Sequence, residues 1–207
     1  MKRCVIVGGA EIGDYEMIKS HLLPDDYSVF CDSGLKHCGM LSLYPDLIVG
    51  DFDSHENPDL PVETIILPCE KDDTDKVYAV KEAVKRGFSD FLLIGTIGGR
   101  IDHTLGNLSI LLMLHEQGKK VTMLDDYSEI SVAGTDISFV DESFSYFSLL
   151  CVSETAKGVN VLNAKYPLHD AEISWNYPYG ISNEPLPGKI SEITVSEGRL
   201  LLVKTRR

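Results

Sequence analysis

The pattern of apolar residues changes near residue 125, and this change restricts the folds that the chain can adopt. Before that point, short runs rich in β-branched residues alternate with segments whose apolar residues recur at helical spacing. Strands that alternate with helices form a mainly parallel sheet with helices on both faces. After that point, short strands follow one another with turn residues between them, which is typical of a β-sandwich. The sequence therefore predicts an α/β domain over residues 1–125 and an all-β sandwich domain over residues 126–207.

The expected elements of the first domain form a Rossmann-like α/β/α arrangement. Strands are predicted at residues 4–7, 28–31, 47–49, 64–67, 91–94 and 120–124, and helices at 13–22, 34–40, 74–86 and 103–116. Two apolar stripes at helical spacing support the last two of these helices. One stripe consists of Val77, Val80 and Val84, and the other of Leu105, Leu108, Leu112 and His115.

The second domain is expected to contain strands without helices. They are predicted at residues 130–133, 137–140, 146–152, 159–162, 190–195 and 200–204. Turn residues at 134–136, 157–158 and 197–198 separate these strands, and no apolar stripe at helical spacing remains. No long linker separates the two domains, so we expect them to share a site.

Charge and composition exclude several classes of function. The 207-residue chain has a formal net charge of −13, which argues against general binding to nucleic acid or to anionic membranes. No segment approaches the roughly 20 apolar residues that span a bilayer. The 5 cysteines include no C-x-x-C pair, which disfavours a disulfide framework and a zinc site. We therefore expect a cytoplasmic protein that binds neither nucleic acid nor a membrane.

Polar clusters follow four of the predicted strands. These clusters are residues 32–34, 51–54, 71–75 and 98–103. Open α/β sheets bind ligands at the carboxyl ends of their strands, so we expect the clusters to meet at one site. Asp32, which opens the first cluster, is a candidate nucleotide contact.

Asp51 and Asp53 come directly after a short apolar strand and lie two residues apart. Residues i and i+2 of a strand point to the same face, so these two carboxylates can converge. Two unit charges about 4 Å apart repel by about 4 kcal/mol at an effective dielectric constant near 20, so the pair needs a cation or a proton between its members. The pattern predicts a divalent metal ion, and an acidic turn at the strand end is the alternative.

The third cluster has more carboxylates than a helix cap needs. Residues 72–75 lie where a helix is expected to begin, and one Asp or Thr is enough to cap it. The surplus favours metal binding over capping alone. Asp75, with Asp51 and Asp53, would form an oxygen-only site of the kind that Mg²⁺ occupies when phosphate oxygens complete its shell.

The fourth cluster, Gly98-Gly-Arg-Ile-Asp-His103, has the features of a phosphate-binding loop. Paired glycines allow close backbone approach, a helix N-terminus offers N–H groups, and Arg100 can clamp phosphate oxygens. Asp102 is a further candidate, and His103 is either a ligand contact or a capping or core histidine. The chain contains no G-x-x-x-x-G-K-[ST] loop and no credible Ser-His-Asp set, so these clusters predict metal and polyphosphate chemistry.

Together the clusters resemble the signatures of the thiamine pyrophosphokinase family. The matching segments are residues 50–54, 72–75 and 98–103 in the first domain, and 157–158, 165–168 and 180–184 in the second. Two positions depart from the pattern. Tyr78 stands where the family often has lysine, and Asn163-Ala164 stands where it usually has Gly-Leu.

The resemblance implies that Mg²⁺ assists the reaction of ATP with thiamine, which gives AMP and thiamine diphosphate. It also implies a homodimer whose active site lies at the subunit interface. The catalytic candidates are Asp51, Asp53, Asp75, Arg100 and Asp102, of which the first three are expected to bind the metal. The ATP-binding candidates are Asp32, Asp72, Thr74, Asp75, Arg100, Asp102 and His103.

The thiamine-binding candidates lie in the second domain. The resemblance places Ser182 and Asn183 in the part of the C-terminal motif that contacts thiamine. Trp175 could stack on the thiamine rings, because aromatic faces attract cationic groups, or it could belong to the core of the sandwich.

Two other functions are compatible with these residues. A metal-dependent phosphohydrolase could use Asp51 as a nucleophile, since an Asp-x-Asp at a strand end also suits an aspartyl-phosphate route. A non-catalytic regulator could use the same acids to hold a nucleotide or thiamine without turnover. The first alternative predicts a covalent phosphoenzyme, and the second predicts tight binding without product.

Overall fold

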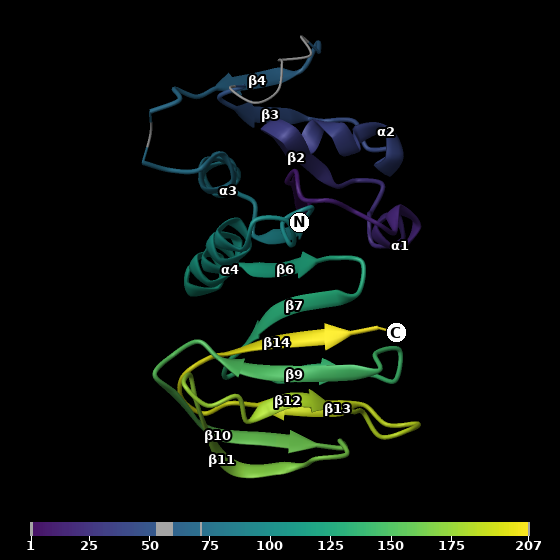
Figure 1. Ribbon diagram of the computed structural model, residues 1–207, viewed down its shortest axis with the longest axis vertical. Helices are drawn as coiled ribbons and strands as arrows, with labels where there is room; N and C mark the ends of the chain where they lie inside the picture. The colour runs from purple at the N-terminus through teal and green to yellow at the C-terminus, as the bar shows by residue number, and fades with distance from the viewer. Residues whose placement is uncertain (1, 53–59, 71, 207) are drawn as a thin grey trace. The chain divides into compact units, whose positions relative to one another are not determined.

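The computed structural model describes residues 2–52, 60–70 and 72–206 (Figure 1). The chain divides into two compact units, Met1–Asp126 and Tyr127–Arg207. In the described ranges, helices occur in the first unit and only strands occur in the second. No helix of the described ranges is long and apolar enough to cross a membrane.

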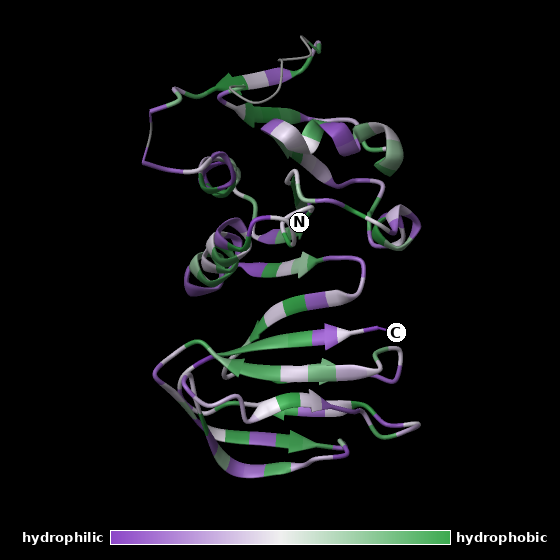
Figure 2. Ribbon diagram, viewed as in Figure 1, coloured by the Kyte–Doolittle hydropathy of each residue, from purple (hydrophilic) through white to green (hydrophobic). Residues whose placement is uncertain are grey.

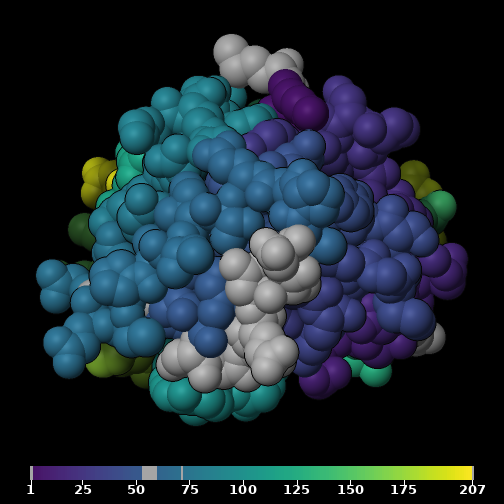
Figure 3. Space-filling view, turned by 90° about the horizontal axis from the view of Figure 1, so that it is seen from above, coloured from purple at the N-terminus to yellow at the C-terminus, as the bar shows by residue number. Residues whose placement is uncertain are grey.

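The first unit is built on a parallel sheet, as the sequence predicts. Its strands lie in the order β6-β5-β1-β2-β3-β4, and each neighbouring pair is parallel. They are β1 (Cys4–Val7), β2 (Tyr27–Cys31), β3 (Leu47–Gly50), β4 (Glu63–Ile66), β5 (Asp90–Ile94) and β6 (Lys120–Leu124). β4 forms an edge with all of its residues at least partly exposed, and Figure 3 shows the surface over this part of the chain in blue. Parallel strands end at the same edge, so the segments that follow them lie close together.

Helices cover both faces of this sheet (Figure 1). They are α1 (Tyr15–Ser20), α2 (Cys38–Leu41), α3 (Asp75–Lys85) and α4 (Ile101–Glu116). α1 and α2 lie on one side, and α3 and α4 lie on the other. Ile18 of α1 packs in one buried cluster with Val5 and Val7 of β1, which share a face because they are two residues apart.

The helix predicted at residues 34–40 is confirmed, but it consists of two short pieces, of which the first is a 3-10 helix. A 3-10 helix, η1 (Asp32–His37), begins directly after β2, and α2 adds a single turn. Gly34 in η1 lies so close to β1 that a Cβ atom there would be 2.3 Å from the carbonyl oxygen of Val7. This close approach keeps the segment after β2 against the end of the sheet.

The helix predicted at residues 103–116 is confirmed as α4, but its buried face differs from the apolar stripe in the sequence. The stripe contains Leu105, whose exposed fraction is 56%. The buried residues are Asn107, Ile110, Leu111 and Leu114. α4 carries apolar residues around most of its circumference, so spacing alone does not fix its rotation. The Asn107 amide donates to the carbonyl oxygen of Thr96 at 2.6 Å, and burial of this polar group requires such a partner.

The second unit is a β-sandwich. Within it, strands β12-β9-β14-β7 form one antiparallel sheet and strands β11-β10-β13-β8 form another. Residues of both sheets, including Phe147 and Val161, pack in one buried cluster. β14 is apolar from Leu200 to Val203 and becomes hydrophilic at Lys204 (Figure 2). The strands are β7 (Ser128–Ala133), β8 (Ser138–Val140), β9 (Tyr146–Cys151), β10 (Thr155–Leu162), β11 (Leu168–Ser174), β12 (Gly180–Asn183), β13 (Ser191–Thr194) and β14 (Leu200–Thr205).

Three local features of this unit differ from the sequence prediction. β11 and β12 are missing from the prediction, because both are largely exposed and lack an apolar alternation. The turn predicted at residues 157–158 is wrong, since both residues lie inside β10. Gly158 has a φ of +61°, and the pairing of β10 with β11 shifts register around it. A turn-forming glycine marks a β-bulge at this position.

Candidate active site

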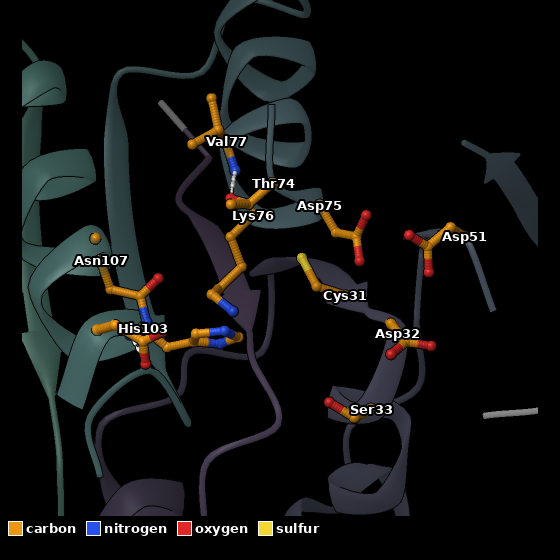
Figure 4. Close-up of a pocket in the computed structure, with 12 residues that line it drawn as sticks. Cys31, Asp32, Ser33, Asp51, Thr74, Asp75, Lys76, Val77, His103 and Asn107 are labelled. Atoms are coloured by element: carbon orange, nitrogen blue, oxygen red, sulfur yellow. Dashed lines mark hydrogen bonds between the residues drawn. The ribbon is translucent and has the colours of Figure 1, made fainter. Parts of the chain in front are cut away.

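A pocket of about 530 Å³ lies in the first unit, where β2 and β3 end and where α3 and α4 begin (Figure 4). Pockets for small molecules commonly enclose ~300–1,000 Å³. Six residues that the sequence analysis singled out line it: Asp32, Asp51, Thr74, Asp75, Asp102 and His103. Polar segments that are far apart in the sequence therefore meet at one pocket.

A second, smaller pocket of about 200 Å³ adjoins the first. The two pockets share Ser33, Lys76, His103 and Asn107 in their linings. The other walls of the smaller pocket are the loop after β1 and the loop between β5 and α4, which includes Arg100. The two pockets together offer an elongated ligand a continuous lining.

The loop between β5 and α4 has a backbone that requires glycine. Gly98 and Gly99 have φ values of +106° and +65°, and a Cβ atom at either position would meet nothing within 4 Å. The left-handed conformation rather than crowding therefore favours glycine at both positions. The N–H of Gly98 donates to Thr104 Oγ1 of α4 at 3.1 Å, which holds the loop over the start of the helix. Both glycines line the smaller pocket, so the backbone of the loop is open to a ligand there.

Four aspartates line the larger pocket, and Figure 4 shows the carboxylates of Asp32, Asp51 and Asp75 on the same side of it. Asp32 follows β2, Asp51 follows β3, and Asp75 begins α3. Carboxylate oxygens are the ligands that Mg²⁺ prefers, so the chemistry of this wall fits a hard divalent cation. Asp53, the other predicted ligand, lies outside the described residues. In the described ranges, no three His, Cys, Asp or Glu side chains are close enough together to hold a metal ion.

Arg100 and Asp102 form a two-point ion pair at the start of α4. Arg100 Nη2 lies 2.6 Å from Asp102 Oδ2, and its Nε donates to Oδ1 at 3.2 Å. This hydrogen-bonded pairing lowers the pKa of the Asp102 carboxyl and raises the pKa of the Arg100 guanidinium. Both side chains are exposed, so the pair is open to a ligand. The guanidinium has five N–H donors and can bind an anion while it still contacts Asp102.

A buried histidine links two walls of these pockets. His37 of η1 is fully buried, and its Nε2 lies 2.9 Å from the carbonyl oxygen of Ala10. Because a carbonyl can only accept, Nε2 carries the proton and Nδ1 accepts from the Tyr15 hydroxyl at 2.8 Å. Burial lowers the pKa of His37, which keeps the ring neutral. The ring thus joins η1, which carries Asp32, to the loop after β1.

Thr74 and His103 resolve alternatives that the sequence leaves open. Thr74 caps α3, with its Oγ1 accepting from the N–H of Val77 at 3.3 Å, and it lines the pocket as well. His103 is exposed and lines both pockets, so it is not a core histidine. Arg100 occupies the N-cap position of α4.

Asp72 lies apart from the other predicted residues of the first unit. It lines a separate open pocket of about 410 Å³ with Asp73, Tyr78 and Lys81. Lys81 Nζ is 2.6 Å from Asp73 Oδ2 at this place. A nucleotide contact at Asp72 remains a prediction.

The sequence analysis missed five residues that line the larger pocket, Cys31, Lys76, Val77, Gly106 and Asn107, and it included Ser33 only as a member of the cluster 32–34. Lys76 follows the predicted site residue Asp75 directly, so the position of that cluster could have indicated it. Asn107 lies one helical turn after His103, on the same face of α4. Burial raises the pKa of the Cys31 thiol to about 12, so this residue forms a wall of the pocket and not a nucleophile.

The candidates of the second unit occupy two kinds of environment. Asn183 is buried, its Nδ2 donates to the carbonyl oxygen of Tyr166 at 2.8 Å, and its Oδ1 accepts from the N–H of Tyr166 at 3.0 Å and from that of Glu184 at 2.9 Å. Ser182 is exposed, with a left-handed backbone at φ +58°. Trp175 has an exposed fraction of 69%, so the alternative that places it in the sandwich core is wrong.

Two family models match the chain, one in each unit. The model described as the catalytic domain of thiamin pyrophosphokinase matches residues 18–123, which is just over half of the chain. The chain belongs to the thiamin pyrophosphokinase family. The model described as the vitamin B1 binding domain of thiamin pyrophosphokinase matches residues 135–200.

Individual members of the thiamin pyrophosphokinase family are similar over most of the chain. A crystal structure of thiamine pyrophosphokinase from Bacillus subtilis matches with a TM-score of 0.86 at 25% identity and covers 99% of both chains. The structure from Geobacillus thermodenitrificans gives a TM-score of 0.83 at 29% identity, over 99% of this chain and 98% of that one. In sequence alone, thiamine pyrophosphokinase from Bacillus subtilis is 28% identical over 143 residues, which cover 68% of this chain and 66% of that protein.

Proposed function

We propose that the chain is a thiamine diphosphokinase that transfers the pyrophosphoryl group of ATP to the hydroxyethyl group of thiamine, with Mg²⁺ as cofactor. The products are thiamine diphosphate and AMP. The observation that carries the proposal is the meeting of three carboxylates with a glycine loop and a helix N-terminus around adjoining pockets of one unit. The family model that matches this unit describes a catalytic domain, which supports the same conclusion.

Asp51 and Asp75, together with Asp53, are the residues that would hold the cation. Bound Mg²⁺ would neutralise negative charge on phosphate oxygens. The parallel sheet and helices of this unit, which support the proposed Rossmann-like architecture, fix Asp51 and Asp75 at the ends of rigid elements. Such placement favours catalysis by positioning, which is the main requirement of phosphoryl transfer.

The loop between β5 and α4 is the proposed binding place for the phosphates. Its left-handed glycines expose backbone N–H groups, and the start of α4 favours negative charge. Arg100 would clamp phosphate oxygens and stabilise charge that develops as the thiamine hydroxyl attacks the β-phosphorus and AMP leaves. Asp102 positions this guanidinium through the ion pair described above. Asp32, Thr74 and His103 line the same space and are proposed nucleotide contacts.

Thiamine binding is proposed for the second unit, which matches the vitamin B1 binding domain model. Trp175 is exposed and offers an aromatic face to a cationic ring. Ser182 is the polar candidate with an exposed side chain, whereas Asn183 already bonds the backbone of Tyr166 and would shape the site through that loop. We further propose a homodimer in which the first unit of one subunit and the second unit of its partner complete each site.

The decisive experiment incubates the purified chain with ATP, Mg²⁺ and thiamine and separates the nucleotides. We expect AMP that depends on thiamine, with an equal amount of thiamine diphosphate. ADP with free phosphate in place of these products would indicate the phosphohydrolase alternative. Tight binding of thiamine and ATP without any product would indicate the regulator.

A further inference from the structure

Lys76 lies where the two pockets of the first unit meet. It belongs to the first turn of α3, directly after Asp75, and it lines both pockets. Figure 4 shows its side chain extending into the larger pocket, in the direction of His103. Neither the motifs of the sequence nor the proposed roles above account for this residue.

The Lys76 ammonium group has no hydrogen bond or ion pair with any residue in the part of the chain that the structure describes. Other lysines of the same helix are paired, since Lys81 binds Asp73 at 2.6 Å and Lys85 binds Glu82 at 3.5 Å. Lys76 is also half-buried, so part of its hydration shell is lost. A cation in this situation is stabilised by an anion that enters the pocket.

The charge of the surrounding groups indicates which anion fits. The chain carries a net charge of −13, and aspartates line the larger pocket, so a polyphosphate would be repelled without local cations. Arg100 is partly neutralised by Asp102, whereas Lys76 retains all three donors. An ammonium group is a compact point charge that can contact oxygens of adjacent phosphates.

We propose that Lys76 binds the phosphate chain of the nucleotide at the junction of the two pockets, between the carboxylate wall and the glycine loop. Its ammonium group contacts the polyphosphate and not the adenosine part. The assignment rests on the proposed function, because it takes the nucleotide to be the ligand of these pockets. It makes Lys76 a determinant of the preference for ATP over AMP.

The test uses the full chain and measures dissociation constants by titration calorimetry for ATP, AMP and inorganic tripolyphosphate at fixed Mg²⁺. Lys76→Met should raise the dissociation constants for ATP and for tripolyphosphate by about 10- to 100-fold, as expected for the loss of a hydrogen bond to a charged group. The dissociation constant for AMP should rise by less than about threefold, because AMP has a single phosphate group. Lys76→Arg should restore most of the affinity. Lys85→Met is the matched control, since Lys85 is on the same helix but is 79% exposed and outside the pockets.

Each other outcome overturns the proposal. Equal losses of ATP and AMP affinity would mean that Lys76 contacts adenosine or only supports the fold, and unchanged ATP affinity would mean no contact. Thermal melting of Lys76→Met and of Lys76→Gln checks that both variants fold. Failure of the proposed function is seen separately, as the absence of thiamine-dependent AMP from the unmodified chain. Lys76-dependent tripolyphosphate binding without AMP formation would therefore refute the function and leave the Lys76 contact standing.

Discussion

The side chains of the larger pocket differ in how much they also contribute to the fold. Asp51 follows β3 and faces the pocket, and its negative charge lies near those of Asp32 and Asp75. Thr74 and Asn107 line the same pocket but also hold helices in place. Substitution of Asp51 should affect activity alone, whereas substitution of Thr74 or Asn107 should affect stability as well.

Asp51→Asn is expected to reduce turnover by at least about 100-fold with little change in melting temperature. The variant lacks a proposed metal ligand, and removal of such a group commonly reduces activity by a large factor. Removal of one charge also relieves repulsion among the pocket carboxylates, so the melting temperature should stay the same or rise. The measurement pairs AMP formation with a thermal melt. Asp25→Asn, an exposed aspartate away from the pockets, is the control, and a large drop in melting temperature with normal turnover would refute the assignment.

His37 is expected to make stability depend on pH. Burial depresses its pKa below 6.5 in the folded protein, so the unfolded chain binds more protons as the pH falls through 6.5. The stabilisation that depends on the neutral ring is therefore present above pH 6.5 and is lost progressively below it. His37→Gln keeps a donor for Ala10 and an acceptor for Tyr15 but does not titrate.

Urea unfolding at pH 7.5, 6.5 and 5.5 tests this expectation. At pH 7.5, His37→Gln should be less stable by about 1–2 kcal/mol, because its amide replaces well-formed buried hydrogen bonds imperfectly. The difference between the two proteins should shrink as the pH falls. A difference that is constant or grows toward pH 5.5 would show that His37 does not titrate in this way.

At the scale of the elements, local signals that act within a few residues are predictable. Thr74 before α3 and Gly87 after it are signals for a helix start and a helix end, and α3 spans Asp75–Lys85. The rotation of α4 is different, because it depends on the bond of Asn107 to the loop after β5. β11 and β12 pair with neighbouring strands without an apolar alternation of their own, so only tertiary pairing reveals them.

The cap of α3 provides a prediction at this scale. Thr74→Ala removes the acceptor for the N–H of Val77 and should lower the free energy of unfolding by about 1 kcal/mol. Thr74→Ser keeps an oxygen at the same place and should recover most of that loss. Urea unfolding at neutral pH measures both variants. If Thr74→Ala and Thr74→Ser lower the free energy of unfolding equally, the hydroxyl group of Thr74 does not cap the helix.

At the scale of the whole molecule, the proposed homodimer can be tested through its shared sites. Asp51→Asn is expected to inactivate the first unit, and Trp175→Ala is expected to weaken thiamine binding in the second. If each site uses the first unit of one subunit and the second unit of its partner, a mixed dimer contains one site without either substitution. Co-expression in equal amounts should then restore about a quarter of normal activity, because about half of the dimers are mixed and each has one intact site.

The molar mass of the protein in solution and the activity of each variant alone serve as controls for this experiment. Light scattering should give a mass near 46 kDa, twice the 22.9 kDa of one chain. Each variant alone should stay at its own low activity. No recovery in mixed dimers would mean that each subunit forms its own site, and a mass of one chain would refute the homodimer.

The sequence by itself determined the parallel sheet and helices of the first unit, the all-β character of the second, and the meeting of polar clusters at the edge of the parallel sheet. These features follow from apolar periodicity, caps and the common direction of parallel strands, all of which act locally or through simple topology. Tertiary structure alone decided the buried face of α4, the bulge at Gly158, the separation of Asp72 from the other acids and the entry of Lys76 into both pockets. Such features depend on which backbone groups and side chains meet across the fold, and a local pattern contains no information about those partners.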